Sequence, residues 1–412
     1  MIIQNTRNRR QFLRGAVGAS AAVGIATRVP NVFAQAAASQ VDDANGRILV
    51  VVQLSGGNDG LNTVVPYLDE LYRAARPTLA LARDSVIRID DQLALHGSMT
   101  GLARLLEDGM LGIVQGVGYD QPNRSHFESM DIWHTCRRKH EPRPAGWLGA
   151  FLDSDPKQSG SDVPALHIGN RQQPMALLAR NVRVPSIDSV DQFQLRGDNV
   201  SLGSLLRNVT PTTAEEANEL LGFVQSSTSA AVVASQQVAQ AIGEYRTDIN
   251  YPQSRLGEQL KTVAQLIDAG LKTRIYYVEL DGFDTHSKQA PAHSVLLEQW
   301  SEAVSAFMRD LVVTGNARRV AVMSFSEFGR RVAENASGGT DHGAAAPMFF
   351  CSERLQQPIL GKSPDLSHLY DGDLQFQIDF RSVYASVLKQ WMDTDPTLVL
   401  GSQYDQLDLF RI

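Results

Sequence analysis

Four short apolar runs, each ending in a cluster of glycine and polar residues, limit most strongly what this chain can fold into. They occupy residues 47–54, 110–117, 274–280 and 319–325. Nearly continuous apolar runs of this length are typical of strands buried on both faces of a parallel sheet. Helical patterns lie between them, at about residues 98–108, 125–138, 211–246, 254–270 and 290–313. This alternation of strand and helix predicts a doubly wound α/β fold.

The first 36 residues have the order of parts found in an export signal. Arg9 and Arg10 open a twin-arginine box, a weakly apolar run follows at 15–26, and a small-x-small cleavage pattern ends at Ala36. The apolar run is too short, and too rich in glycine and alanine, to be a good membrane span. We therefore predict a twin-arginine signal peptide at 1–36, export of the folded protein by the twin-arginine translocase, and a periplasmic or extracellular location. The alternative is an amphipathic or disordered N-terminal tail.

The net charge depends on whether this signal is removed. The chain of 412 residues has 38 basic and 45 acidic side chains, a formal net charge of −7. The first 36 residues contain five arginines and no acidic residue, so the other 376 have 33 basic and 45 acidic side chains, or −12. This acidity argues against nucleic acid as a partner, because phosphate backbones require a basic surface.

A polar linker is predicted at 37–46. After it, no stretch of about 18 apolar residues occurs, so no stable membrane span is predicted.

Composition limits the kind of site and the domain organisation. The only two cysteines, Cys136 and Cys351, exclude a disulfide scaffold and a Cys-rich zinc or iron–sulfur module. Sequence does not decide whether they pair with each other after export or are small buried residues. Residues 195–255 are rich in Ser, Ala, Gln, Asn and Thr, and they predict a helical insertion that caps the sheet or covers a cleft.

The apolar runs lead directly into potential ligand residues. In open α/β sheets, ligands bind beyond the carboxyl ends of the strands, so we expect these residues to converge on one face. Oxygen ligands with imidazole suit Zn²⁺, Mn²⁺, Mg²⁺ or Ca²⁺. The residues that follow the first, third and fourth runs are Asp59, Asp281, Asp284, His286 and Glu327. The alternatives are an ordinary Asn-Asp-Gly turn at Asp59 and a solvated polar turn at 281–286.

The second run leads into Arg124, Ser125 and His126, where a loop becomes a helix. Backbone N–H groups at a helix start favour anions. One interpretation makes Ser125 a nucleophile or a metal-bound hydroxyl, with Arg124 or His126 contacting an oxyanion. The other makes Ser125 a residue that helps cap the helix.

Asp341 and His342 lie between glycines in a loop that precedes another apolar run, at 347–350. An adjacent Asp and His with little local bulk form a compact pair of candidate metal ligands. The alternative is a glycine-rich loop whose histidine is merely exposed. For Arg330 and Arg331, pairing with Glu334 is favoured over binding an anion.

Taken together, these segments resemble a twin-arginine-exported bacterial family of unknown function (DUF1501-like) within the alkaline phosphatase/sulfatase superfamily. The resemblance covers nearly all of the chain after the signal, and its motifs are modest singly but specific in their order. The matching segments are LSGGNDGLN (54–62), NRSHFESMDIW (123–133), DGFDTH (281–286), SFSEFGRRVAEN (324–335), GTDHG (339–343) and IDFRSVYASVL (378–388).

The resemblance implies an alkaline-phosphatase-like domain at 47–412, with a mostly parallel central sheet flanked by helices and the insertion at about 195–255. In the superfamily, a strand-end Asp, a Ser or Thr nucleophile and an Asp-His pair serve one metal. The corresponding residues here are Asp59, Ser125, Asp341 and His342. A second metal takes an Asp and two His, and Asp281 or Asp284 with His286 matches part of that set.

This sequence departs from the superfamily pattern at Glu327. Glu327-Phe328 stands where superfamily members often have the Asp-His pair, so His342 is then free to be the second His of the other metal. His368 has no distinctive setting, and the full ligand set is one His short. The leading hypothesis is an exported, metal-dependent hydrolase of small anionic phosphate or sulfate esters that uses Ser125 as nucleophile. The alternative is a non-catalytic exported binding or assembly protein on the same fold.

Overall fold

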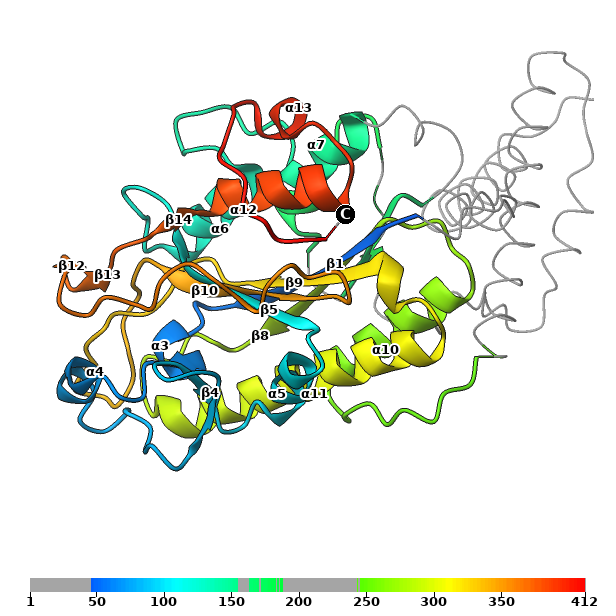
Figure 1. Cartoon of the computed structure of the whole chain (residues 1–412). Coiled ribbons are helices and arrows are strands. Elements are labelled where there is room, and N and C mark those ends of the chain that lie inside the picture. The colour runs from blue at the N-terminus through cyan, green and yellow to red at the C-terminus, as the bar shows by residue number, and fades with distance from the viewer. Residues whose placement is uncertain are drawn as a thin grey trace, which may run out of the picture.

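The structure is a computed structural model, and it describes residues 46–154, 163–169, 172–182, 184, 186–187, 243 and 245–411. Its centre is a nine-stranded sheet with the order β11-β5-β10-β9-β1-β8-β6-β7, to which β14 adds by pairing with β5 (Figure 1). The strands are β1 (Ile48–Ser55), β5 (Leu111–Gly118), β6 (Ala165–Ile168), β7 (Ser186–Ile187), β8 (Ile275–Asp281), β9 (Val320–Phe325), β10 (Ala346–Cys351), β11 (Ile359–Leu360) and β14 (Ile378–Asp379).

All but one of these strands run in the same direction. β1 is parallel to β8 and β9, and β6 is parallel to β8. β10 is antiparallel to both of its neighbours, β5 and β9. The expected mostly parallel sheet is therefore confirmed, and the four predicted strands fall within a residue of their observed bounds. The apolar run at 347–350 was not predicted as a strand, although it forms the reversed one.

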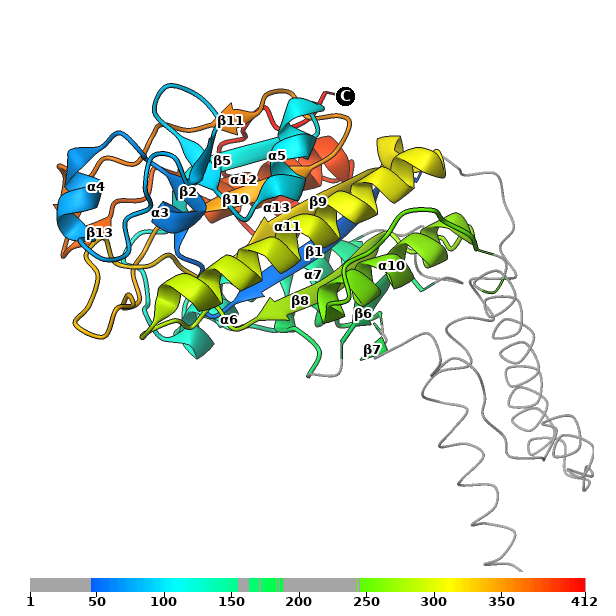
Figure 2. The ribbon, with the colours of Figure 1, turned by 90° about the horizontal axis from the view of Figure 1, so that it is seen from below.

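Helices cover both faces of the sheet, as the doubly wound fold requires (Figures 1 and 2). One face carries α5 (Thr100–Glu107), α10 (Arg255–Asp268) and α11 (Gln289–Val313), and the other carries α6 (His126–Thr135), α7 (Trp147–Ser154), α12 (Phe380–Ser386) and α13 (Pro396–Leu400). Alternate residues of β1 enter two separate cores: Val50 and Val52 pack on the α11 side, whereas Leu49 and Val51 pack on the α6 side. Because β1 is buried on both faces, its sequence does not alternate between apolar and polar residues.

Short helices and two small sheets lie outside the central sheet. α3 (Gly60–Thr63) and α4 (Glu70–Ala75) follow β1. A three-stranded sheet has the order β2-β4-β3, and a separate hairpin pairs β12 with β13. These strands are β2 (Val64–Val65), β3 (Val86–Arg88), β4 (Ala94–His96), β12 (Leu369–Tyr370) and β13 (Asp373–Leu374). Short 3₁₀ turns lie at Met175–Leu177 and Ala317–Arg319, and a π-helical turn lies at Val387–Trp391.

Some expectations fall outside the described residues. They are the signal peptide at 1–36, most of the linker at 37–46 and most of the insertion at 195–255. Nearly all of the helix expected at 211–246 belongs to that insertion and is likewise not described. Cys136 and Cys351 are both buried and unpaired. Within the described ranges, no helix combines the length and apolar character needed to cross a bilayer.

Candidate metal centre

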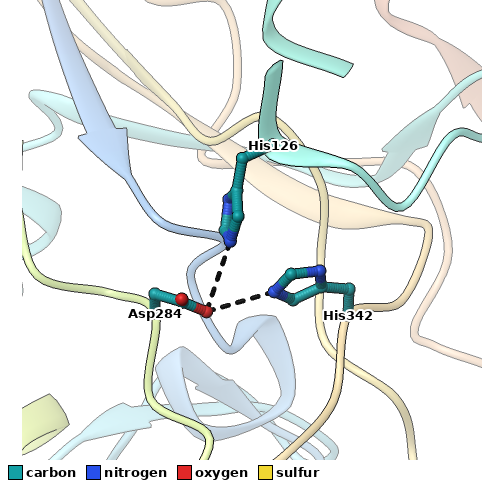
Figure 3. A group of neighbouring side chains, drawn as sticks. All are labelled: His126, Asp284 and His342. Carbon is teal, nitrogen blue, oxygen red and sulfur yellow. Dashed lines mark hydrogen bonds and ion pairs between the residues drawn. The ribbon is translucent and has the colours of Figure 1, made fainter. Parts of the chain in front are cut away.

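Imidazole and carboxylate groups from distant parts of the chain meet at one edge of the sheet (Figure 3). His126 begins α6 after β5, Asp284 follows β8, and His342 precedes β10. Because β10 is antiparallel to its neighbours, its first residue lies at the edge where the parallel strands end. A loop that comes before a strand can therefore reach the same place as loops that come after strands.

Asp284 is the centre of this group. Its Oδ1 lies 3.3 Å from Nε2 of His126, 3.1 Å from Nε2 of His342 and 3.1 Å from Nε2 of His286. The ligand atoms of His126, Asp284 and His342 all lie within 4.8 Å of one another, close enough to hold one metal ion. Nε2 of His286 lies 2.9 Å from Nε2 of His342. We call these four residues (His126, Asp284, His286 and His342) the His3Asp cluster.

The other ring nitrogen of each histidine is fixed by an acceptor. Nδ1 of His126 lies 2.9 Å from Oε1 of Glu327, and Nδ1 of His286 lies 3.2 Å from Oδ1 of Asp341.

The third acceptor is a backbone group: Nδ1 of His342 donates to the carbonyl of Arg124 at 2.7 Å. A carbonyl can only accept, so this Nδ1 carries the hydrogen and, in the neutral ring, Nε2 presents a lone pair to the cluster. Metal-binding histidines are typically held in this way by a carboxylate or a backbone carbonyl.

The protonation states suit a metal at two members of the cluster. Burial acts to raise the pKa of Asp284, but hydrogen bonds with His342 and Arg330 outweigh it and lower that pKa to about 2. Burial lowers the pKa of His342, although its bond to Asp284 opposes this. An ionised carboxylate beside a neutral imidazole is the form that binds metal. The bond to Glu327 raises the pKa of His126 against the effect of burial, so at this ring a metal has to compete with a proton.

The group of ligand atoms that lie within reach of one ion has two imidazole nitrogens and one carboxylate oxygen, and His286 adds a third imidazole beside Asp284 and His342. This set of donors fits a divalent transition metal. Nε2 of His126 is buried and lies 3.3 Å from Oδ1 of Asp284, so it points into the cluster as a ligand atom should. Mg²⁺, Ca²⁺ and Mn²⁺ are better suited by oxygen ligands, so the donor set fits Zn²⁺ best of the four metals considered.

Ser125 lies beside the His3Asp cluster without being engaged in its helix cap. It is the N-cap residue of α6, is exposed, and makes no side-chain cap hydrogen bond. Its backbone N–H donates instead to Oδ1 of Asn123 at 2.8 Å. Both of its chain neighbours are bound at the cluster, Arg124 through its carbonyl and His126 through its ring.

The guanidinium of Arg124 is held away from the His3Asp cluster. Its Nε donates to Oδ2 of Asp373 at 2.9 Å, and its Nη2 lies 2.9 Å from Oδ2 of Asp371. The group that Arg124 contributes at the cluster is thus its backbone carbonyl. Asp281 is the last residue of β8, is exposed, and is not a member of the three-residue group of ligand atoms.

Asp59 lies in a separate buried network. Its Oδ2 accepts from Nη1 of Arg76 at 2.6 Å and from Nε2 of Gln289 at 2.5 Å. Burial acts to raise the pKa of Asp59, yet Arg76 lowers it below its ordinary value. The structure therefore does not bring Asp59 into the His3Asp cluster, and its Oδ1 is buried without a hydrogen-bond partner.

Sequence reasoning missed the part played by Arg330. The expected partner of Arg330 and Arg331, Glu334, instead accepts from the backbone N–H groups of Thr78 and Leu79. The Arg330 side chain is buried and bonds to Asp284 and to several backbone carbonyls. The nearest sequence signal was the position of this arginine three residues after Glu327. Arg76 had no signal, because it comes from a short surface helix with ordinary polar composition.

Several solved structures align with the chain at low identity. The C-terminal periplasmic domain of EcEptC from Escherichia coli, in complex with Zn, gives a TM-score of 0.34 at 12% identity, over 76% of this chain and 75% of that one. The PsFucS1 sulfatase from Pseudoalteromonas sp. gives 0.39 at 9%, over 91% and 74%. The lipoteichoic acid synthase LtaP from Listeria monocytogenes gives 0.37 at 8%, over 89% and 74%.

Comparison at the level of sequence places the chain in a family. No protein with a curated description matches it. A family profile with the description "Protein of unknown function (DUF1501)" matches residues 47–373, which include every residue of the His3Asp cluster. The chain therefore belongs to the DUF1501 family of proteins of unknown function.

Proposed function

We propose that this protein is a metal-dependent hydrolase of phosphate or sulfate esters. The observation that carries the proposal is the orientation of three histidines around Asp284. Each presents Nε2 to the same carboxylate, while its Nδ1 is held by Glu327, Asp341 or the Arg124 carbonyl. Such doubly fixed rings are unusual on a protein surface and are typical of metal sites.

The proposed metal ligands are the four residues of the His3Asp cluster. A bound divalent cation supplies a Lewis acid that polarises an ester oxygen and lowers the pKa of a nearby hydroxyl. Zn²⁺ is favoured over Mn²⁺, Mg²⁺ and Ca²⁺ by the imidazoles. Glu327, Asp341 and the Arg124 carbonyl fix the orientation of the rings, and His342 together with Arg330 lowers the pKa of Asp284 against the effect of burial.

Ser125 is the proposed nucleophile. Its Oγ attacks phosphorus or sulfur, its proton passes to the departing alcohol, and water then releases phosphate or sulfate and restores the hydroxyl. Its exposure, the absence of a side-chain cap bond and its place between Arg124 and His126 support this role. The start of α6, a helix of ten residues, also directs backbone N–H groups toward an anion.

The test is an assay of the purified chain loaded with Zn²⁺, Mn²⁺, Mg²⁺ or Ca²⁺ in turn. Aryl phosphate monoesters, phosphate diesters and sulfate esters are the substrates. We expect turnover with at least one pairing, a loss of more than about 100-fold in kcat for Ser125→Ala, and metal binding retained in that variant. Ser367→Ala, on an exposed loop, is the matched control. Turnover that is equal in the wild type and in Ser125→Ala would exclude this mechanism.

The proposal includes export. Arg9 and Arg10 within the box at 9–14, the apolar run at 15–26 and the Ala36 cleavage pattern support a signal at 1–36, a linker at 37–46 and a domain at 47–412 with an insertion near 195–255. Replacing Arg9 and Arg10 by lysine should retain the protein in the cytoplasm of a host that has a twin-arginine translocase. Periplasmic fractions of both versions, compared by immunoblot, test this.

A second candidate function is a non-catalytic binding or assembly protein on the same fold. It is favoured by Asp59, whose carboxylate is bound to Arg76 and Gln289 instead of facing the His3Asp cluster. Elemental analysis of the purified protein separates the two functions. Bound metal with turnover supports the hydrolase, whereas the absence of both bound metal and a metal-induced thermal shift supports the binding protein.

A further inference from the structure

Arg330 is a buried cation directly behind the His3Asp cluster. Its side chain has no exposed area, and it donates to acceptors in three different loops. Nε donates to the carbonyl of Gly57 at 2.7 Å, and Nη1 donates to the carbonyl of Thr340 at 2.8 Å. Nη2 lies 2.8 Å from the carbonyl of Phe283 and 2.9 Å from Oδ1 of Asp284, and it also contacts the carbonyl of Gly56.

Two of these three loops carry members of the His3Asp cluster, namely Asp284 and His286 after β8 and His342 before β10, and the third follows β1 beside them. Gly56 and Gly57 follow β1, Phe283 and Asp284 follow β8, and Thr340 stands two residues before His342. The loops are more than 50 residues apart in sequence, and backbone hydrogen bonds join them in pairs: Phe283 donates to Ser55 at 3.1 Å, and Gln289 donates to Gly338 at 2.9 Å. The Arg330 guanidinium adds one group that bonds to all three loops at once.

The backbone of Arg330 strengthens the same connection. Arg330 forms an isolated antiparallel bridge with His342. On either side of it, Gly343 donates to the carbonyl of Gly329 at 2.8 Å, and Arg331 donates to the carbonyl of Asp341 at 2.9 Å. The segment that carries His342 is thus held by Arg330 through both main chain and side chain.

The backbone around Arg330 is closely packed at two glycines. A Cβ on Gly343 would lie 2.5 Å from the carbonyl carbon of Arg330, and a Cβ on Gly57 would lie 2.3 Å from the Phe328 ring. All three guanidinium nitrogens of Arg330 are bonded, Nε to Gly57, Nη1 to Thr340 and Nη2 to acceptors of the other loops, and this spread over a planar fork suits arginine. A lysine has three donors on one atom and cannot reach the carbonyls of Gly57 and Thr340 together.

We propose that Arg330 is a positioning residue that holds Asp284 and His342 in place for metal binding by tying the loops after β1, after β8 and before β10. It does so without touching substrate. This inference rests on the proposed function, because it assigns the His3Asp cluster to a metal. It adds that the geometry of the cluster depends on one buried guanidinium.

The test is Arg330→Lys in the full chain, with Arg319→Met as the matched control. Arg319 is a partly buried arginine at the opposite end of β9, where it donates to Asn316 and to the carbonyl of Ile267. Zn²⁺ affinity is measured by competition with a chelator, and the visible spectrum of the Co²⁺-loaded protein reports ligand geometry. Hydrogen exchange of residues 55–60, 282–287 and 339–344 reports the loops without any metal.

We expect Arg330→Lys to weaken Zn²⁺ binding by about 10–100-fold, as for other residues that orient metal ligands. The Co²⁺ spectrum should change, and all three loops should exchange faster. Arg319→Met should lower the melting temperature and leave affinity and spectrum unchanged. Wild-type affinity and spectrum in Arg330→Lys would overturn the inference and leave the proposed function standing.

Two further outcomes are also decisive. If the wild type binds no metal, the proposed function fails. Unchanged exchange in the three loops of Arg330→Lys would then overturn the positioning role as well, whereas faster exchange would support it as a role in loop assembly.

If Arg330→Lys does not fold, Arg330→Ala with added methylguanidinium replaces it. Recovery of loop protection with methylguanidinium, and not with equal methylammonium, supports the inference, and no recovery with either opposes it.

Discussion

Nδ1 of His342 donates to the backbone carbonyl of Arg124 at 2.7 Å, although the two residues are 218 positions apart in the chain. This bond fixes the ring of His342 and, at the same time, the loop that presents Ser125. It connects the proposed nucleophile to the proposed metal site through the ring of His342 and the main chain of Arg124, so it does not depend on the Arg124 side chain. The cluster and the serine are therefore expected to move together.

Removal of a cluster histidine should abolish tight metal binding. His342→Ala removes an Nε2 ligand and should weaken Zn²⁺ binding by more than about 100-fold, a larger loss than for residues that only orient ligands. His368→Ala is the control, because that histidine is exposed and pairs with Asp365 at a distance from the cluster. Chelator competition measures both. Equal affinities in the two variants would exclude His342 as a ligand.

The carboxylates behind the rings should have a smaller effect. Glu327→Gln and Asp341→Asn keep the shape of the acceptor but remove its charge from Nδ1 of His126 or His286, so each should weaken metal binding by about 10–100-fold. Asp365→Asn is a close control, since Oδ2 of Asp365 lies 2.9 Å from Nδ1 of His368 in an exposed pair. That control should bind metal as the wild type does. Isothermal titration with Zn²⁺ would detect the difference.

The two carboxylates that hold Arg124 should differ in their contribution to stability. Asp373 is buried and Asp371 is exposed, although both contact the same guanidinium. Breaking a buried hydrogen-bonded pair leaves a desolvated group, so Asp373→Asn should lower the free energy of unfolding by about 1–3 kcal/mol. Asp371→Asn should change it by less than about 1 kcal/mol, because exposed pairs are screened. Urea unfolding compares them, and equal losses would contradict this assignment.

Stability should fall in mild acid because of a buried histidine. Burial lowers the pKa of His293 from 6.5 to about 4, and its Nε2 lies 2.9 Å from Oδ1 of Asn58. Between these values the unfolded chain binds a proton that the folded protein does not. The stabilisation is complete above pH 6.5 and is lost as the pH falls toward 4, at about 1.4 kcal/mol per pH unit for one proton.

His293→Gln should remove this one-proton slope from the metal-free protein. Urea unfolding between pH 4.5 and pH 7 measures the slope in both proteins. His134, whose pKa burial lowers to about 3, contributes a similar slope that should remain in the variant. An unchanged slope in His293→Gln would contradict the assignment.

The fold was largely predictable because each main strand carries its own signal. A run such as Ile48–Ser55 is apolar on both faces, and that pattern identifies a central strand without reference to the rest of the chain. The direction of β10 was not predictable in this way. Its apolar run identifies a buried segment, but the choice between parallel and antiparallel pairing depends on the neighbours β5 and β9, which lie elsewhere in the sequence.

The residues that form the site could be predicted from the sequence only in part, for a similar reason. Ligand residue types pointed to Asp284 and His286 after a strand and to His342 in a glycine-rich loop, and the structure brings these three together. His126 was predicted to contact an oxyanion, and the structure places its ring against Asp284 in the same cluster. Ligand residue types also pointed to Asp59, which lies at a strand end but is bound by Arg76. A local motif shows which residues can bind a metal. It does not show whether a distant arginine binds one of them first.

The reversed strand has a consequence for how this chain is made. β5 pairs with β10, β11 and β14, all of which come after residue 345, whereas β5 itself ends at Gly118. During synthesis β5 therefore stays unpaired, with its apolar side chains and its backbone N–H and C=O groups exposed, until most of the remaining chain has emerged. Such unpaired strands are prone to aggregate, so the nascent chain should depend on chaperones, and truncation before residue 346 should yield insoluble protein.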